Sequence, residues 1–539
     1  MFNQTEEKVG NAFAFSIRKL DHSLIYFLLL TGLAVSLPVS EFTTSVFEIM
    51  LLGNWIIEGR FREKLQLLRQ RKSLWLILSV YLVHILSMSY TADIGFGFHD
   101  LRIKLPLLVL PLIIGTSEPI NYGRLRILIL FFSAIVLVNT LISASLLFGI
   151  VDYAITDIRQ ISIFISHIRF SLMINISIFS LFYLILDRDF KAGSLIRLTL
   201  AIVVVWLILF LFLLQSITGI VIFMATGMLL FLTRMNRLEN LVLRWSLFIL
   251  ALTIPMIFLS YITRSITRYY TVDKIEVAGL ECCTPAGNVY YHDFNNKQIE
   301  NGHYVWLYLC EKELEQQWNQ RSTLDYQGKD RRGQDLRFTL IRYMTSMGFR
   351  KDSVGVSKLS DADITNVEDG LTNYIFAGKL GLYPKLYEVI WQVDMFRKGG
   401  NPSGHSVTQR LLYLQAAVAI ISENRLVGVG TGDVIDAYHD YYRDTNSVLS
   451  ERWRLRAHNQ YLTFMVTFGI TGSLWILLSF ILPVFIENKW NNYFFLMFFL
   501  IGFLSMLNED TLETHIGVSF FAFFYSLFLL GLKDGKAGS

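Results

Sequence analysis

The chain has 539 residues, of which 53% are hydrophobic and 14% aromatic, and its mean hydropathy is +0.45. These values exclude an ordinary soluble globule, because runs of about 20 apolar residues are typical of membrane-spanning helices. The net charge of +4 does not indicate nucleic-acid binding, since membrane topology explains most of the basic residues.

The apolar runs predict an all-α integral membrane protein with about twelve transmembrane helices. The predicted spans, in chain order, are 23–40, 43–58, 73–91, 102–117, 124–149, 166–186, 196–214, 216–233, 245–262, 458–486, 491–507 and 515–532. The first 21 residues are polar, and the first span lacks a clear small-residue cleavage site. We therefore expect no cleavable signal peptide.

Basic residues in short loops predict the orientation in the membrane. They crowd residues 60–72, flank the loop 234–244 and follow the last span at Lys533 and Lys536. All three places are cytoplasmic if both termini are inside, which is consistent with twelve spans. The long connection 263–456 is then expected on the outer face.

The predicted organisation is a helical membrane body interrupted by one large outer insert. Residues 1–262 hold transmembrane helices 1–9, and residues 457–539 hold helices 10–12 with a cytoplasmic tail. Between them, residues 263–456 form an insert of about 190 residues, which is the size of a domain. Its second half is predicted to be mainly helical. The helical stretches expected there are 335–347, 369–378, 384–397 and 406–422.

The insert also contains the three cysteines, a glycine run and several histidines. Cys310 is predicted either to form a disulfide with Cys282 or Cys283 or to remain a free thiol. The glycine run 428–432 resembles a phosphate-binding loop, but no Lys-Ser/Thr follows it and no βαβ unit surrounds it, so we reject a nucleotide site. The histidines do not have metal-ligand spacing, and no metal or other cofactor is expected.

Several basic residues lie at predicted outer ends of spans, against the positive-inside rule. Arg102 and Lys104 begin the fourth span, Arg169 lies in the sixth, and Arg410 begins an amphipathic helix of the insert. The planar guanidinium group binds diphosphate oxygens in a bidentate manner, so a lipid diphosphate is the expected ligand. Arg102 and Lys104 are also explained by snorkelling to lipid headgroups, as are Arg264 and Arg268 after the ninth span.

The run Arg456-Ala457-His458-Asn459-Gln460-Tyr461-Leu462 enters a hydrophobic span directly from the polar insert. An imidazole at such a junction is costly unless it is solvated or used. His458 is suited to take a proton from a hydroxyl group near neutral pH. An interface anchor is the alternative role, but Asn459 and Tyr461 add polar groups on the same turns and favour a site.

The stretch Arg410–Gly472 resembles the O-antigen ligase and O-antigen polymerase superfamily. Its motifs occur in the order Arg410-Leu-Leu-Tyr-Leu-Gln, then Leu426-Val-Gly-Val-Gly-Thr-Gly-Asp433, then Ala457-His-Asn-Gln-Tyr-Leu462, then Gly469-Ile-Thr-Gly472. The tail Glu509-Asp510-Thr511-Leu512 also looks family-like. One departure is Ser216-Ile217-Thr218-Gly219, where many members carry a Ser-Arg-Gly-like start to the eighth span.

The resemblance implies an inverting, metal-independent glycosyltransferase with a GT-C-like membrane fold. Such enzymes act at the periplasmic face of the bacterial inner membrane, as multi-pass proteins. They transfer a glycan from an undecaprenyl diphosphate carrier to an acceptor hydroxyl. The catalytic residues it implies are His458, Arg410 and Arg169, and we expect Arg456, Asn459, Tyr461, Arg102 and Lys104 to bind substrate.

The favoured interpretation is O-antigen ligation to lipid A-core during lipopolysaccharide biosynthesis. The alternatives with the same chemistry are a polysaccharide polymerase, whose acceptor is a growing glycan, and a protein O-oligosaccharyltransferase. A transporter of the lipid-linked glycan is the non-enzymatic alternative. It would predict charged residues deep along several spans, where the sequence has few. The acceptor, the sugar, the oligomeric state and the role of residues 270–400 are left open.

Overall fold

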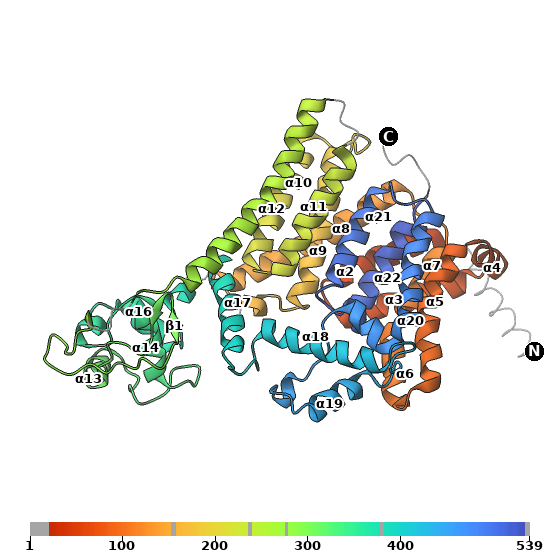
Figure 1. Cartoon of the computed structure of the whole chain (residues 1–539). Helices are drawn as coiled ribbons and strands as arrows, with labels where there is room; N and C mark the ends of the chain where they lie inside the picture. The colour runs from red at the N-terminus through yellow and green to blue at the C-terminus, as the bar shows by residue number, and fades with distance from the viewer. Residues whose placement is uncertain (1–20, 152–157, 236–239, 275–278, 378–381, 534–539) are drawn as a thin grey trace, which may run out of the picture. The chain divides into compact units, whose positions relative to one another are not determined.

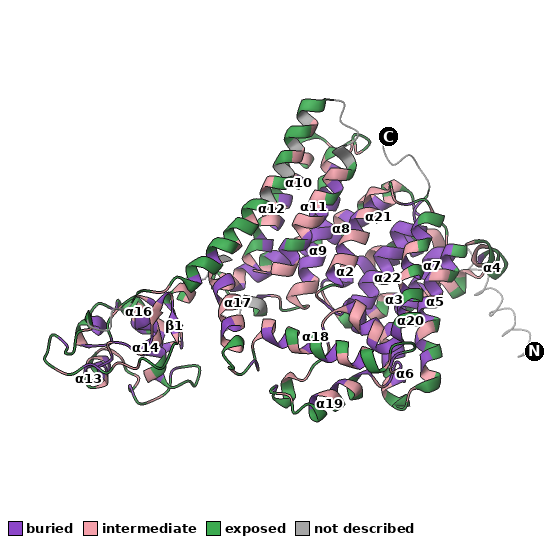
Figure 2. Ribbon diagram, viewed as in Figure 1, coloured by how far each residue is buried: buried purple, intermediate pink, exposed green. Residues whose placement is uncertain are grey.

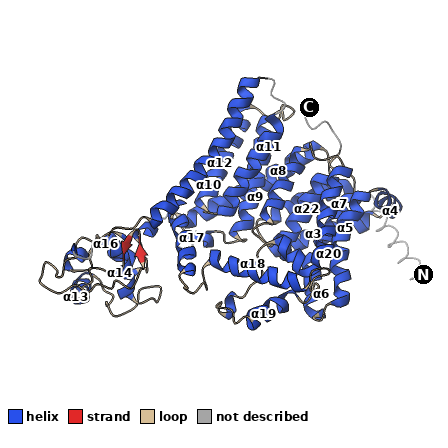
Figure 3. Ribbon diagram, viewed as in Figure 1, coloured by secondary structure: helices blue, strands red, loops and turns tan. Residues whose placement is uncertain are grey.

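The computed structural model describes residues 21–151, 158–235, 240–274, 279–377 and 382–533 (Figure 1). These residues are mostly helical, and the sheet among them consists of two short antiparallel strands (Figure 3). Strand β1 (Ile299–Glu300) pairs with β2 (His303–Tyr304), with Ile299 opposite Tyr304. The chain divides into two compact units.

The first unit comprises residues 1–248 and 401–539. Its helices before the insert are α2 (His22–Ser36), α3 (Glu41–Glu58), α4 (Phe61–Gln70), α5 (Lys72–Ser87), α6 (Ile94–Lys104), α7 (Pro106–Thr116), α8 (Tyr122–Leu147), α9 (His167–Leu186), α10 (Ser194–Leu213), α11 (Ile217–Met235) and the start of α12 (Leu241–Tyr270). After the insert come α18 (Ser406–Glu423), α19 (Val434–Asp444), α20 (Gln460–Ile486), α21 (Tyr493–Ser505) and α22 (His515–Leu530). Short 3₁₀ turns occur at Met88–Tyr90, Ile158–Ile161, Glu451–Trp453 and Thr511–Glu513.

Helix α22 forms the centre of this unit. Every residue from Ile516 to Leu530 is buried, and the helix packs against α7 and α21 (Figure 2). Other helices expose apolar side chains instead, such as Leu195, Ile202 and Leu209 of α10. A helix that is apolar all round and buried suits a bundle core, whereas exposed apolar side chains suit a lipid-facing surface.

Each of the twelve predicted spans contains a helix of the structure. Five stretches among the described residues are long and apolar enough to cross a membrane, and the fold is therefore that of an all-α membrane protein. These stretches are Lys72–Tyr90, Tyr122–Leu147, His167–Leu186, Ser194–Leu213 and Gln460–Ile486. Four further apolar helices are shorter: His22–Ser36, Ile217–Thr233, Tyr493–Ser505 and His515–Leu530. The total of about twelve crossings stays a prediction.

The glycine run 428–432 packs against a kink in α20. Gly469 has φ +60° inside that helix, and a Cβ atom on Gly428 or Gly469 would meet the opposing backbone at 2.4 Å. The backbone N–H of Val429 donates to the carbonyl of Val466, and Ile470 N–H donates to that of Arg425. The loop therefore replaces helix hydrogen bonds that the kink leaves open, which is a structural reason for these glycines.

The second unit comprises residues 249–400. It contains the later part of α12 and the helices α13 (Glu311–Arg321), α14 (Leu336–Ser346), α15 (Ser353–Ser357), α16 (Asp361–Glu368) and α17 (Leu382–Arg397). Its core surrounds Trp318 and Tyr343, which are fully buried. The predicted insert 263–456 is thus shared between units, because residues 401–456 fold with the first.

Two predictions about the insert have definite outcomes. Cys310 is a buried free thiol, and Cys282 and Cys283 are exposed free thiols, so the free-thiol alternative is the one observed. The prediction of a helix at 369–378 is wrong for the described residues 369–377, among which the 3₁₀ turn Tyr374–Ala377 is the only helical segment. Its last residue lies outside the described residues.

Candidate functional site

The candidate site is organised around the connection between α21 and α22, residues 507–513. Eight side chains were predicted to form the catalytic or substrate-binding site. All of them except Arg102 and Tyr461 contact a residue of this connection. The contributing elements are α6, α9, α18 and the residues that lead into α20. All of them belong to the first unit, so the site is defined within one compact body.

Arg410 and Arg169 contact adjacent residues of this connection. The Arg410 guanidinium, on α18, donates a hydrogen bond to the Asn508 side-chain oxygen. The Arg169 Nη2 atom, on α9, lies 3.5 Å from Glu509 Oε1. The structure therefore brings together two arginines that the sequence places on a membrane helix and on the insert. Guanidinium groups that contact successive residues of one segment are an arrangement suited to a diphosphate.

Thr218 joins the same cluster at the position where the sequence departs from the family pattern. The Asn508 amide donates to the Thr218 hydroxyl over 2.6 Å while its oxygen accepts from Arg410. Thr218 lies in the first turn of α11. The Thr218 hydroxyl thus holds the amide that orients Arg410.

Arg169 has unused hydrogen-bonding capacity. Its side chain is mostly buried, and the Nε atom has no hydrogen-bond partner among the described residues. A buried donor without a partner costs free energy, so native structures rarely keep one without a reason. An anionic ligand that approaches Arg169 beside Glu509 would satisfy this group.

His458 lies just before α20 in an unusual backbone conformation. Its φ of +47° is in the left-handed region, which costs roughly 1 kcal/mol or more for a residue other than glycine. The next residue, Asn459, caps α20 by accepting from the Leu462 N–H. The imidazole packs against the Tyr413 ring, with 5.8 Å between centroids. Tyr413 and the cap thus hold the imidazole at the end of the helix.

The surroundings of His458 favour its neutral form. Burial lowers its pKa below the ordinary 6.5; nearby Arg410 and Arg456 act in the same direction, and Glu509 opposes them. The Nδ1 atom lies 3.8 Å from Asp510 Oδ2, so the other ring nitrogen, Nε2, remains for a hydroxyl group. A neutral imidazole can accept a proton, which is what a general base requires.

Arg456 and Lys104 form a buried ion network with Glu513. The Arg456 Nη1 and the Lys104 Nζ atoms each lie 2.9 Å from Glu513 Oε2. Lys104 also pairs with Asp100, one turn earlier on α6, at 2.6 Å. Although burial alone would raise it, Lys104 and Arg456 lower the pKa of Glu513 to about 2. These two cations therefore hold the connection in place beside His458.

Asn459 and Tyr461 make structural contacts beside the site. The Asn459 amide donates to the carbonyl of Leu507, and the Tyr461 hydroxyl donates to that of Phe503. Gln460, between them, bonds both to Glu513 and to the N–H of Leu512. The residues that enter α20 thus fix its position against the end of α21. Their predicted role in binding substrate stays a prediction.

Arg102 lies apart from the cluster. Its exposed guanidinium contacts His99 Nδ1 at 3.3 Å and lines a cavity of about 610 Å³ between α3, α6 and α7. The polar lining of this cavity includes Glu48 and His515, which are 3.1 Å apart. Lys104 and Arg102 are therefore separated on α6, one toward the cluster and the other toward this cavity.

The residues that the sequence-based site lacked are mainly acidic. Glu509, Asp510 and Glu513 are all buried, and each lies close to at least one predicted cation. One feature of the sequence marks them: three carboxylates within five residues separate two apolar runs. Buried carboxylates in a membrane protein need partners, but the burial of this short connection is evident only from the structure.

One comparison with known proteins found a match. Residues 374–477 match the family model described as O-antigen ligase. This confirms the superfamily resemblance, and the matched stretch contains Arg410, Arg456, His458, Asn459 and Tyr461. No curated protein matches the chain. The family and the apolar helices indicate a multi-pass membrane protein and a glycosyltransferase of the ligase or polymerase type.

Proposed function

We propose that this chain is an inverting, metal-independent glycosyltransferase with a lipid-diphosphate-linked glycan donor. It transfers the glycan to an acceptor hydroxyl at the periplasmic face of a bacterial inner membrane. The observation that carries the proposal is the convergence of Arg410, Arg169 and His458 on residues 508–510. Two diphosphate-binding groups and one neutral base therefore share a single site.

The two arginines stabilise the leaving group. When the bond between the anomeric carbon and the diphosphate oxygen breaks, negative charge grows on the lipid diphosphate. Arg169 and Arg410 neutralise this charge through bidentate hydrogen bonds, which is the electrostatic role that a metal ion has in other transferases. Glu509 and Asn508 orient the guanidinium groups before the donor binds.

His458 activates the acceptor. The acceptor oxygen forms a bond to the anomeric carbon while its proton passes to the imidazole. A single displacement on the face opposite the leaving diphosphate inverts the anomeric configuration. Asp510, 3.8 Å from Nδ1, stabilises the imidazolium that results.

We propose O-antigen ligation to lipid A-core as the biological reaction, because the matched family model is described as O-antigen ligase. A gene deletion tests this acceptor directly. The proposal predicts that lipopolysaccharide loses its long glycan while lipid A-core accumulates. Loss of glycan from proteins instead would favour an O-oligosaccharyltransferase, and a change in glycan length alone would favour a polymerase.

The proposed mechanism also predicts that purified protein transfers glycan in excess EDTA. The donor for this assay is a synthetic polyprenyl diphosphate glycan, and the acceptor is purified lipid A-core. Activity that disappears in EDTA and returns with Mg²⁺ or Mn²⁺ would contradict the role given to the arginines.

A further inference from the structure

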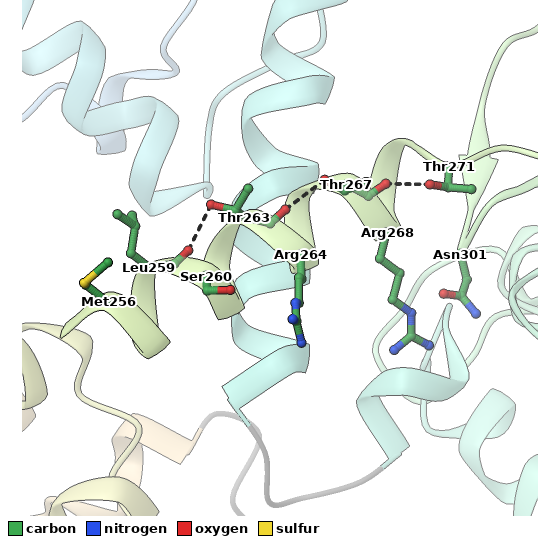
Figure 4. Close-up of a pocket in the computed structure, with 9 residues that line it drawn as sticks. All are labelled: Met256, Leu259, Ser260, Thr263, Arg264, Thr267, Arg268, Thr271 and Asn301. Carbon is green, nitrogen blue, oxygen red and sulfur yellow. Dashed lines mark hydrogen bonds between the residues drawn. The ribbon is translucent and has the colours of Figure 1, made fainter. Parts of the chain in front are cut away.

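A groove runs along the later half of α12 in the second unit (Figure 4). It has a volume of about 870 Å³, and its lining includes Met256, Leu259, Arg264, Arg268 and Asn301. Figure 4 shows the Arg264 and Arg268 side chains projecting from the same side of the helix, with Asn301 beside Arg268. The groove contains no acidic residue among the described residues that line it.

The two arginines give the groove its positive charge, and no acidic residue is present among the described residues that line it. They are four residues apart, so their side chains lie one helical turn from each other on one face. Both are exposed, and in the described part of the chain no carboxylate pairs with either. An anion placed between them would contact both guanidinium groups.

The Arg268 guanidinium lies over an aromatic ring, and no ion pair joins it to another residue in the described part of the chain. Its guanidinium carbon lies 4.5 Å from the centroid of the Tyr383 ring. A cation–π contact uses the face of the guanidinium group and leaves the N–H groups at its edge for an oxyanion. Tyr383 therefore orients Arg268 without occupying its hydrogen-bond donors.

The threonine hydroxyl groups of the groove are already used within the helix. The hydroxyl groups of Thr263, Thr267 and Thr271 donate to the carbonyls of Leu259, Thr263 and Thr267, as the dashed lines in Figure 4 show. The charge of the groove thus comes from the two arginines, and they determine which ligand it selects.

The opposite end of the groove is apolar and exposed. Met256 and Leu259 line it, and they are 69% and 64% exposed, as is the neighbouring Ile257 at 63%. A contiguous exposed apolar surface indicates contact with a membrane or a partner. The groove therefore offers a cationic end and an apolar end along one helix, which matches the chemistry of an anionic lipid.

We propose that this groove binds an anionic phospholipid of the outer leaflet, with its phosphate between Arg264 and Arg268 and an acyl chain along Met256 and Leu259. The charge complementarity decides the occupant: a zwitterionic headgroup would leave part of the cationic charge uncompensated. The described residues that line the groove are apolar side chains, hydroxyl groups, one amide and the two arginines, which suits the binding of a lipid. The interaction is independent of the proposed glycan transfer.

Lipid retention measured by native mass spectrometry of the delipidated full-length protein tests the proposal. We expect phosphatidylglycerol to bind the wild type at least about tenfold more tightly than the double variant Arg264→Gln/Arg268→Gln. The matched control Arg332→Gln/Lys358→Gln removes two exposed charges elsewhere in the second unit and should bind as the wild type does. Both double variants should show the wild-type thermal unfolding curve, since all four side chains are exposed.

Three competitor ligands complete the experiment. Phosphatidylethanolamine and inorganic phosphate should each bind the wild type more weakly than phosphatidylglycerol. Equal binding of inorganic phosphate would show a free-anion site and overturn the proposal. A preference for a polyprenyl diphosphate, or undiminished phosphatidylglycerol binding by the Arg264→Gln/Arg268→Gln variant, would overturn it as well.

Discussion

The Arg169 guanidinium lies 3.5 Å from the Glu509 carboxylate, and this pair joins α9 to the connection between α21 and α22. Arg410 binds the preceding residue, Asn508, from α18. The two arginines therefore contact neighbouring positions of one short segment, although one comes from a membrane helix and the other from the predicted insert. Their convergence there gives the proposed mechanism its diphosphate site.

Replacing either arginine with lysine tests whether the planar fork matters. Arg169→Lys and Arg410→Lys keep the charge but lose bidentate geometry, so we expect transfer to fall by about 10²-fold or more. The control Arg443→Lys changes an exposed arginine that pairs with Asp440 and Asp444, and it should stay near the wild-type rate. Glycan transfer is measured with the purified variants. If Arg169→Lys or Arg410→Lys transfers glycan at nearly the wild-type rate, that arginine has only a structural role.

Replacing His458 with asparagine tests the general base. Asparagine tolerates the left-handed conformation at φ +47°, so His458→Asn keeps the backbone while removing the base. We expect the transfer rate to fall by about 10²- to 10⁴-fold. The thermal unfolding curve should change little. A well-folded variant with an unchanged rate would reduce His458 to an interface residue.

The pH dependence of transfer follows from the neutral form of His458. Because its pKa is lowered by burial, kcat/KM should stay constant as the pH falls through 6.5 and decline only below that value. Glu509 opposes this shift, so Glu509→Gln should move the acid limb further down. An acid limb at or above pH 6.5 in the wild type would contradict this assignment.

The fold of the first unit followed from sequence more readily than the pairing within its site. Apolar runs predict helices directly, because a span must satisfy its backbone hydrogen bonds internally. The apolar pattern did not predict which of Arg102 and Lys104 faces the site. Residues two apart on a helix differ by about 200° in direction, so only one of them faces the cluster.

The acidic partners were missed for a related reason. Glu509, Asp510 and Glu513 lie in a short connection between apolar runs, and such a connection is ordinarily solvated. Their burial depends on tertiary contacts with α6, α9 and the entry to α20, which no local pattern contains. The basic residues were found because positive charge at an outer face departs from a topological rule.

Removing the Glu513 charge should destabilise the first unit. Glu513→Gln leaves Lys104 and Arg456 without their shared anion, and breaking a buried ion pair costs roughly 3–5 kcal/mol. We expect a clear drop in Tm, measured in detergent by intrinsic fluorescence. Glu281→Gln offers a control, because its partner Arg350 is partly exposed and the pair should contribute little. Equal Tm values for both variants would show that the ion network around Glu513 does not stabilise the first unit.

The proposed mechanism is tested most sharply by the anomeric configuration of the product that the purified protein forms. A polyprenyl diphosphate glycan of known configuration is incubated with the acceptor, and the new linkage is identified by NMR spectroscopy. We expect the wild type to invert the linkage and to release one lipid diphosphate per bond formed, whereas His458→Asn should form almost no product. A retained configuration, or product formation by His458→Asn at the wild-type rate, would contradict the proposed mechanism.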